Sequence, residues 1–145
     1  MDSGDTLQRF LFEGNGVRGS LVHLDAVHHG VVRARAYPPA VGRLLGESLA
    51  AAALLSGSIK SHAGLILQVQ SAGAIRLLVA QSSGTRNLRG LARYDAAAAL
   101  DEGGMGALCG QGHLAITIGR GAGQRYQALV ELTGESLAES VEQYF

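Results

Sequence analysis

The strongest constraint on the fold is a stretch of alternating hydrophobicity, LILQVQSAGAIRLLVAQ, at residues 65–81. Apolar residues occupy alternate positions on both sides of the glycine-containing segment SAGA. A period of two that resumes after a turn is typical of a β-hairpin with one buried face. In the second half we expect Ile75, Leu77 and Val79 to face the core, with Arg76 on the opposite side.

The rest of the chain alternates between strand-like and helix-like patterns, which predicts an α+β fold. Strands are expected over residues 7–12, 17–24, 88–94, 114–118 and 126–132, and helices over 28–36, 39–55 and 135–145, with a helical turn at 105–109. Pro39 suits a first helical turn, and Asp25 is a candidate helix cap. A length of 145 residues indicates one domain, built from antiparallel or mixed β-sheets packed with several α-helices.

Composition excludes several classes of protein. The N-terminus carries Asp2 and Asp5 where a signal peptide needs positive charge, and no apolar segment follows. The longest apolar run, residues 49–55, is far too short to span a bilayer. A single cysteine excludes an internal disulfide framework. We therefore expect a soluble protein with a cytoplasmic location.

Charge is unevenly distributed although the net charge is zero. Residues 9–93 hold ten basic and three acidic side chains, whereas residues 94–145 hold seven acids and two arginines. The two parts are expected to face each other or a second copy of the chain. A nucleic-acid surface is the alternative, but no aromatic side chain lies between Tyr37 and Tyr94 to stack on bases. Nucleic-acid binding is therefore not favoured.

Two glycine-rich segments resemble nucleotide-binding motifs only superficially. GNGVRG at residues 14–19 matches the dinucleotide fingerprint, but the following SLVHL is strand-like, whereas that motif requires a helix. GRGAGQR at residues 119–125 lacks the lysine and hydroxyl residue of a phosphate-binding loop. Both are predicted to be turns between strands.

The histidines and the cysteine do not form a recognisable metal or catalytic motif. Adjacent His28 and His29 point to different sides of a helix, and one cysteine with scattered histidines is a poor zinc ligand set. Cys109 precedes His113 by four residues, but GQG between them breaks any helix. A thiol-dependent hydrolase or transferase using Cys109 is one hypothesis, and a packing role for a buried thiol is the favoured one. We predict no catalytic, cofactor-binding or metal-binding residues.

The order of the segments resembles the N-terminal core domain of the redox-regulated holdase chaperones, the heat shock protein 33 family. The resemblance rests on VRG at residues 17–19, LLSGSIK before GLILQVQSAGAIRLLVA, then LRGLAR, GQGHLAITI and YQALVELTGESLAESVEQYF. These segments cover nearly the whole chain in order. The turn SAGA departs from the family, whose members often have two glycines and a proline there.

The resemblance implies a bacterial, cytoplasmic stress-response chaperone. It implies ATP-independent binding of unfolded client proteins, prevention of their aggregation, homodimerisation, and no enzymatic activity. In that family four zinc-binding cysteines, spaced C-x-C and C-x-x-C, form a redox switch near the C-terminus, and this sequence has no such motif. We therefore expect residues 1–145 to be the core domain alone, with no cofactor of its own and with the linker and zinc domain outside the chain.

Overall fold

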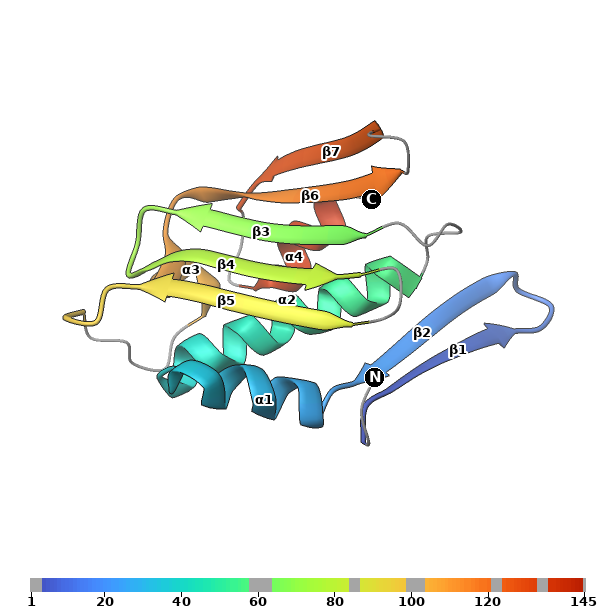
Figure 1. Ribbon diagram of the computed structural model, residues 1–145. Coiled ribbons are helices and arrows are strands. Elements are labelled where there is room, and N and C mark those ends of the chain that lie inside the picture. The colour runs from blue at the N-terminus through green and yellow to red at the C-terminus, as the bar shows by residue number, and fades with distance from the viewer. Residues whose placement is uncertain are drawn as a thin grey trace.

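A computed structural model describes residues 4–57, 64–83, 87–98, 104–120, 124–132 and 136–144 (Figure 1). Its elements confirm the α+β class expected from the sequence. In chain order they are β1 (Thr6–Phe12), β2 (Val17–His23), α1 (Ala26–Arg35), α2 (Pro39–Gly57), β3 (Leu65–Ser71), β4 (Ile75–Ser82), β5 (Leu88–Tyr94), α3 (Met105–Cys109), β6 (Gly112–Arg120), β7 (Gln124–Glu131) and α4 (Leu137–Tyr144).

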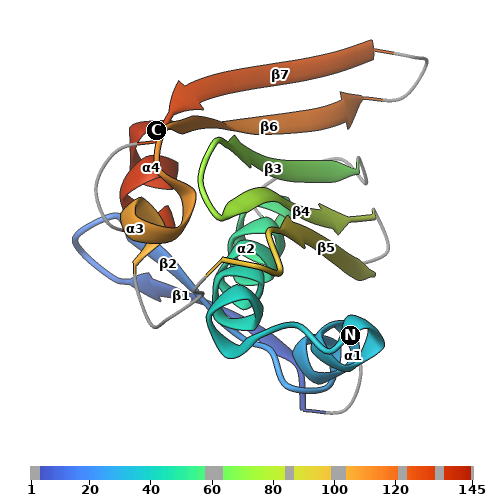
Figure 2. The same cartoon turned by 90° about the vertical axis from the view of Figure 1, so that its left-hand side faces the viewer.

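Five strands form an antiparallel sheet in the order β5-β4-β3-β6-β7, and β1 and β2 form a separate hairpin. The helix α2 packs along one face of the sheet, against β3, β4 and β5, and α4 contacts both α2 and β7. The described helices lie on the same side of this sheet (Figure 2). The opposite face, called the outer face below, is therefore covered by no described helix.

The core lies between α2 and the sheet. Leu65, Leu67 and Val69 of β3 are buried, as the alternation predicts. Gly90 of β5 allows a close approach, because a Cβ atom there would lie 3.2 Å from both Leu45 and Leu49 of α2. A larger residue at this position would push the helix away from the strand.

The predicted buried face of β4 is wrong beyond its first residue. The pairing of β4 with β5 shifts between Ile75 and Leu77, so Arg76 is an extra residue in a β-bulge. The bulge reverses the side-chain alternation, and the buried residues are Ile75 and Leu78 instead of Leu77. Leu77 and Val79 thus belong to the outer face.

The start of α1 also differs from expectation. Asp25 stands before the helix but makes no side-chain capping bond, and its carboxylate instead lies 3.0 Å from His29 Nδ1. The buried carboxylate of Asp5 accepts hydrogen bonds from the backbone amides of Asp25 and Val27. A residue at the entrance to β1 therefore caps the helix in place of Asp25.

Other local predictions are confirmed. Pro39 is the first residue of α2, and the glycines at the start of GNGVRG, Gly14 and Gly16, lie with positive φ in the turn between β1 and β2, while the VRG that follows belongs to β2. A positive φ is accessible to glycine without steric cost. None of the described helices is both long and apolar enough to cross a membrane.

Candidate functional site

The β1–β2 hairpin exposes most of the large apolar side chains found on the surface of the described residues. Phe10 is 47% exposed, Leu11 58%, Phe12 56%, Val17 50% and Leu21 61%. Scattered single apolar residues are normal on a protein surface, but a contiguous group marks an interaction site. The hairpin is therefore the first candidate surface.

The pairing of the two strands places four of these residues on one face. Phe12 pairs with Val17, Gln8 with Leu21, and Phe10 with Gly19. The rings of Phe10 and Phe12 meet edge to face, with centroids 5.7 Å apart. We call Phe10, Phe12, Val17 and Leu21 the apolar hairpin face.

Gly19 is what lets the Phe10 ring lie flat on this hairpin. A Cβ atom at Gly19 would stand 2.1 Å from the tip of the Phe10 ring, so the ring would have to move away from the strand. The glycine in the middle of β2 weakens the strand but provides space for the aromatic ring. The VRG segment thus serves the geometry of the apolar hairpin face.

The opposite face of the hairpin is attached to α2. A Cβ atom at Gly57 would lie 3.0 Å from the Leu7 side chain, and the Arg9 guanidinium donates a hydrogen bond to the Gly57 carbonyl oxygen. Figure 1 shows the hairpin beside the end of α2, apart from the five-stranded sheet. Because Leu7 and Arg9 contact the helix, the apolar hairpin face points away from it.

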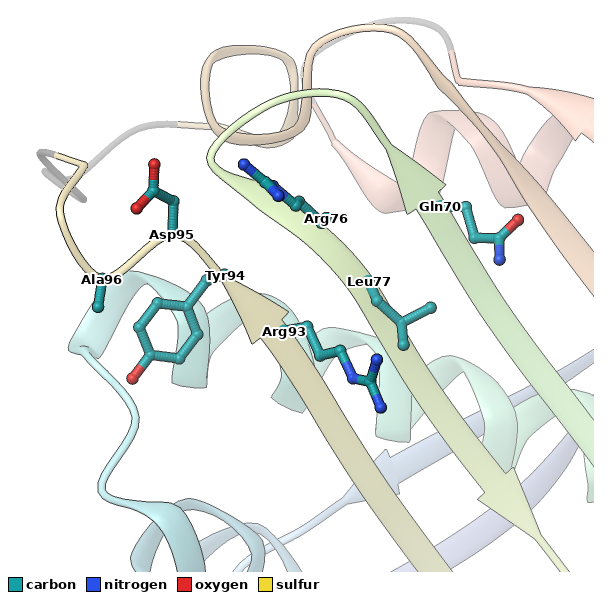
Figure 3. A pocket seen from close by; sticks show the side chains of 7 residues that line it. All are labelled: Gln70, Arg76, Leu77, Arg93, Tyr94, Asp95 and Ala96. Carbon is teal, nitrogen blue, oxygen red and sulfur yellow. The ribbon is translucent and has the colours of Figure 1, made fainter.

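The outer face of the sheet is a second candidate surface, of mixed character. One row of facing residues crosses all five strands and runs Leu129, Ala115, Gln68, Val79 and Leu91. Leu129 is 63% exposed, and the others are partly buried. At one end of this face a hollow of about 600 Å³ is bordered by two arginines (Figure 3).

A third, apolar hollow lies on the helical side. Its volume is about 630 Å³, and it is lined mainly by small and aliphatic residues of α2 and α4. Leu54, Leu137 and Val141 are among them. A groove of this size and character can receive apolar side chains.

Cys109 is placed as the packing hypothesis requires. It ends α3, is fully buried, and belongs to the hydrophobic core. Burial raises the pKa of the Cys109 thiol, and a hydrogen bond with Ser71 opposes this with a smaller effect. A nucleophilic cysteine needs the opposite shift, because the thiolate is the reactive form.

The other sequence candidates are not assembled into a catalytic arrangement in the described part of the chain. His113 is exposed on the outer face, whereas Cys109 lies in the core. His28 Nε2 lies 3.0 Å from the carbonyl oxygen of Gly42, which ties α1 to α2. Among the residues that the structure describes, no group of three or more histidine, cysteine or acidic side chains is placed to hold a metal ion.

Comparison with known proteins identifies the chain's relatives. The chain is 44% identical to a 33 kDa chaperonin of Pseudomonas aeruginosa over 145 residues, which is all of this chain and 49% of that protein. It is 46% identical to a 33 kDa chaperonin of Pseudomonas syringae over 141 residues, 97% of this chain and 47% of that protein. The chain thus spans about half the length of these relatives.

A solved structure and a protein-family model match the chain as well. The crystal structure of a Thermotoga maritima 33 kDa chaperonin, a heat shock protein 33 homologue, matches with a TM-score of 0.86 and 25% identity. The match covers 98% of this chain and 50% of that one. A sequence model of the Hsp33 protein family matches residues 5–145. The chain therefore belongs to the Hsp33 family.

Proposed function

We propose that residues 1–145 form the substrate-binding core of a chaperone that holds unfolded proteins without ATP and prevents their aggregation. The observation that carries this proposal is the apolar hairpin face. It consists of four large apolar side chains, and each of them is about half exposed or more. Membership of the Hsp33 family, whose relatives are named chaperonins, supports it.

The chemistry of the hairpin suits many client sequences. An apolar surface attracts exposed aliphatic and aromatic side chains without requiring a particular sequence, because hydrophobic association is non-directional. An extended client can also add to the edge of a strand through backbone hydrogen bonds. β5 and β7 are the edge strands of the main sheet. Binding of this kind involves no covalent step, so the proposal includes no catalysis.

Redox activation and dimerisation belong to the same proposal. We place the linker and a zinc-binding redox switch outside these residues, in the half of the relatives' length that this chain does not span. Two copies of the chain are proposed to form a homodimer, in the bacterial cytoplasm. Sedimentation velocity over a range of protein concentrations measures this association directly.

Light scattering from a thermally unfolding client enzyme tests the holdase activity. The chain is expected to suppress scattering without added ATP. Replacement of Phe10 and Phe12 by serine should abolish most of the suppression. Leu11→Ser is the control, because it removes a similarly exposed apolar side chain from the opposite face of the same hairpin. Circular dichroism of both variants checks that they remain folded.

The two variants separate the apolar hairpin face from exposed apolar surface in general. Equal loss of suppression in both would show that no particular surface is used. Full suppression by the folded Phe10→Ser, Phe12→Ser variant would overturn the assignment to the hairpin. No suppression by the unmodified chain, together with no binding of a hydrophobic dye, would overturn the proposed function itself.

A further inference from the structure

The hollow at one end of the outer face is lined by two arginines. We call it the arginine pocket and define it by Gln70, Arg76, Leu77, Arg93, Tyr94 and Asp95. Figure 3 shows these side chains on β3, β4, β5 and the segment after β5. Its volume of about 600 Å³ is sufficient to receive several side chains of another polypeptide.

The β-bulge in β4 creates this pocket. Without it, the alternation would place Arg76 on the face opposite Leu77. With the extra residue, Arg76 and Leu77 together oppose Arg93 of β5, and all three line the same hollow. Bulges often re-aim a side chain beside a functional site. Leu77 therefore joins Arg76 and Arg93 on the outer face.

The described side chains of the pocket have a positive balance of charge, with two arginines and one carboxylate. Within the described part of the chain, neither Arg76 nor Arg93 forms an ion pair with a carboxylate. Arg89, also on β5, differs in donating a hydrogen bond to Gln81 Oε1 at 3.2 Å. The one carboxylate in the pocket, Asp95, accepts a hydrogen bond from the Ala97 amide. The pocket thus carries two positive charges against one negative charge, with neither arginine held in an ion pair by the described residues.

We propose that the arginine pocket binds acidic side chains of an extended polypeptide that lies across the outer face. This rests on the proposed function and specifies which clients the chain prefers. Guanidinium groups form charge-assisted, bidentate hydrogen bonds with carboxylates. The neighbouring Leu77, Val79 and Leu91 accept the apolar residues of the same segment. Preferred clients therefore carry glutamate or aspartate beside an apolar run.

The geometry favours a polypeptide over a nucleic acid. In Figure 3 the Arg76 side chain extends toward Asp95 and that of Arg93 extends the other way, which suits separate carboxylates on one chain. A single-stranded nucleic acid needs exposed aromatic faces for base stacking. Tyr94 is only partly exposed, and its ring meets that of Tyr37 edge to face with centroids 6.1 Å apart.

Fluorescence anisotropy with two labelled peptides tests the proposal on the 145-residue chain. One peptide carries two glutamates beside an apolar run, and the other has glutamine in their place. The glutamate peptide is expected to bind roughly fivefold more tightly at low salt, because each partly exposed ion pair contributes little. The preference should shrink as ionic strength rises.

Two double variants assign the preference to the pocket. The variant that combines Arg76→Gln with Arg93→Gln should bind the two peptides equally. Its affinity for both should match that of the unmodified chain for the glutamine peptide. Arg33→Gln with Arg35→Gln removes the same charge from exposed positions on α1 and should keep the preference. This control separates the pocket from the net charge of the protein.

The outcomes distinguish this inference from the proposed function. Equal binding of the two peptides, or a preference kept by Arg76→Gln with Arg93→Gln, would overturn the arginine pocket while leaving holdase activity intact. Failure to bind either peptide, without suppression of aggregation, would overturn both. Competition with inorganic phosphate and with a single-stranded oligonucleotide completes the test. The unlabelled glutamate peptide is the reference competitor. If phosphate or the oligonucleotide displaces the labelled glutamate peptide at a lower concentration than this reference does, the pocket is a phosphate site instead.

Discussion

The hydroxyl group of Tyr37 binds a backbone amide at the edge of the main sheet. Its removal should lower the free energy of unfolding measurably. Its oxygen accepts a hydrogen bond from the backbone amide of Ala92, on the edge strand β5, at 3.1 Å. Both residues are buried, with 7% and 5% of their surfaces exposed. Tyr37→Phe keeps the ring and its edge-to-face contact with Tyr94 but leaves the amide without an acceptor.

The magnitude follows from the cost of an unsatisfied buried donor. Leaving such a group unpaired costs about 1–3 kcal/mol, and the retained ring adds no cavity, so we expect a loss of about 1.5 kcal/mol. For a chain of this size, that corresponds to a fall of about 4 °C in melting temperature. Urea denaturation followed by circular dichroism measures it, with an unchanged m-value. Hydrogen exchange should also show loss of protection at the Ala92 amide.

Tyr94→Phe is the matched control, because it makes the same chemical change in the ring that packs against Tyr37. Within the described residues, the Tyr94 hydroxyl has no hydrogen-bond partner, and the residue is only partly buried. Its loss should change stability by less than about 0.5 kcal/mol. Equal stability of the two variants would refute the reasoning, since it would mean that water satisfies the Ala92 amide.

Two further predictions concern glycine and cysteine. Gly73→Ala should cost about 3 kcal/mol in urea denaturation, because the new Cβ would lie 2.5 Å from the Cys109 carbonyl oxygen. A Cβ atom at Gly30 would have no other atom within 4 Å, so Gly30→Ala should stabilise α1 by up to about 1 kcal/mol. Equal changes in stability for Gly73→Ala and Gly30→Ala would contradict the role of the contact at Gly73. Burial raises the Cys109 pKa above its ordinary value of 9.0, so the folded state favours the neutral thiol. The contribution of Cys109 to stability should be constant below pH 9.0 and be lost as pH rises through the folded-state pKa, and Cys109→Ala should remove that decline. Iodoacetamide should label Cys109 slowly in the folded protein and rapidly in urea, and equally fast labelling would contradict its burial.

Much of the fold follows from local patterns in the sequence. The alternation in residues 65–69 determines a buried strand face, and Pro39 marks the start of a helix because its ring fixes φ and needs no amide partner. The glycines of GNGVRG lie in a turn and not in a dinucleotide-binding motif, because a strand follows them instead of a helix. A packing role for Cys109 was the favoured interpretation because GQG separates it from His113, and the structure places the thiol in the core.

The candidate sites were harder to predict from the sequence than the fold was. The sequence pattern of β2 places Val17 and Leu21 on one face of the strand and Val22 on the other. It does not indicate which of these two faces is exposed to solvent. That depends on Leu7 and Arg9 contacting the end of α2, about fifty residues away along the chain. The apolar hairpin face is therefore a product of tertiary packing.

The arginine pocket shows the same division most clearly. By itself the sequence determined that β3 and β4 form a hairpin with a covered face, because apolar spacing is a property of each strand. Arg76 faces away from the core as expected, but only the tertiary structure decided that Leu77 and Val79 share its face, because a bulge arises from the register between β4 and β5. Likewise, Asp5 caps α1 across twenty residues, and no local pattern marks that pairing. Periodicity determines which residues can share a face, whereas register and packing decide what each face meets.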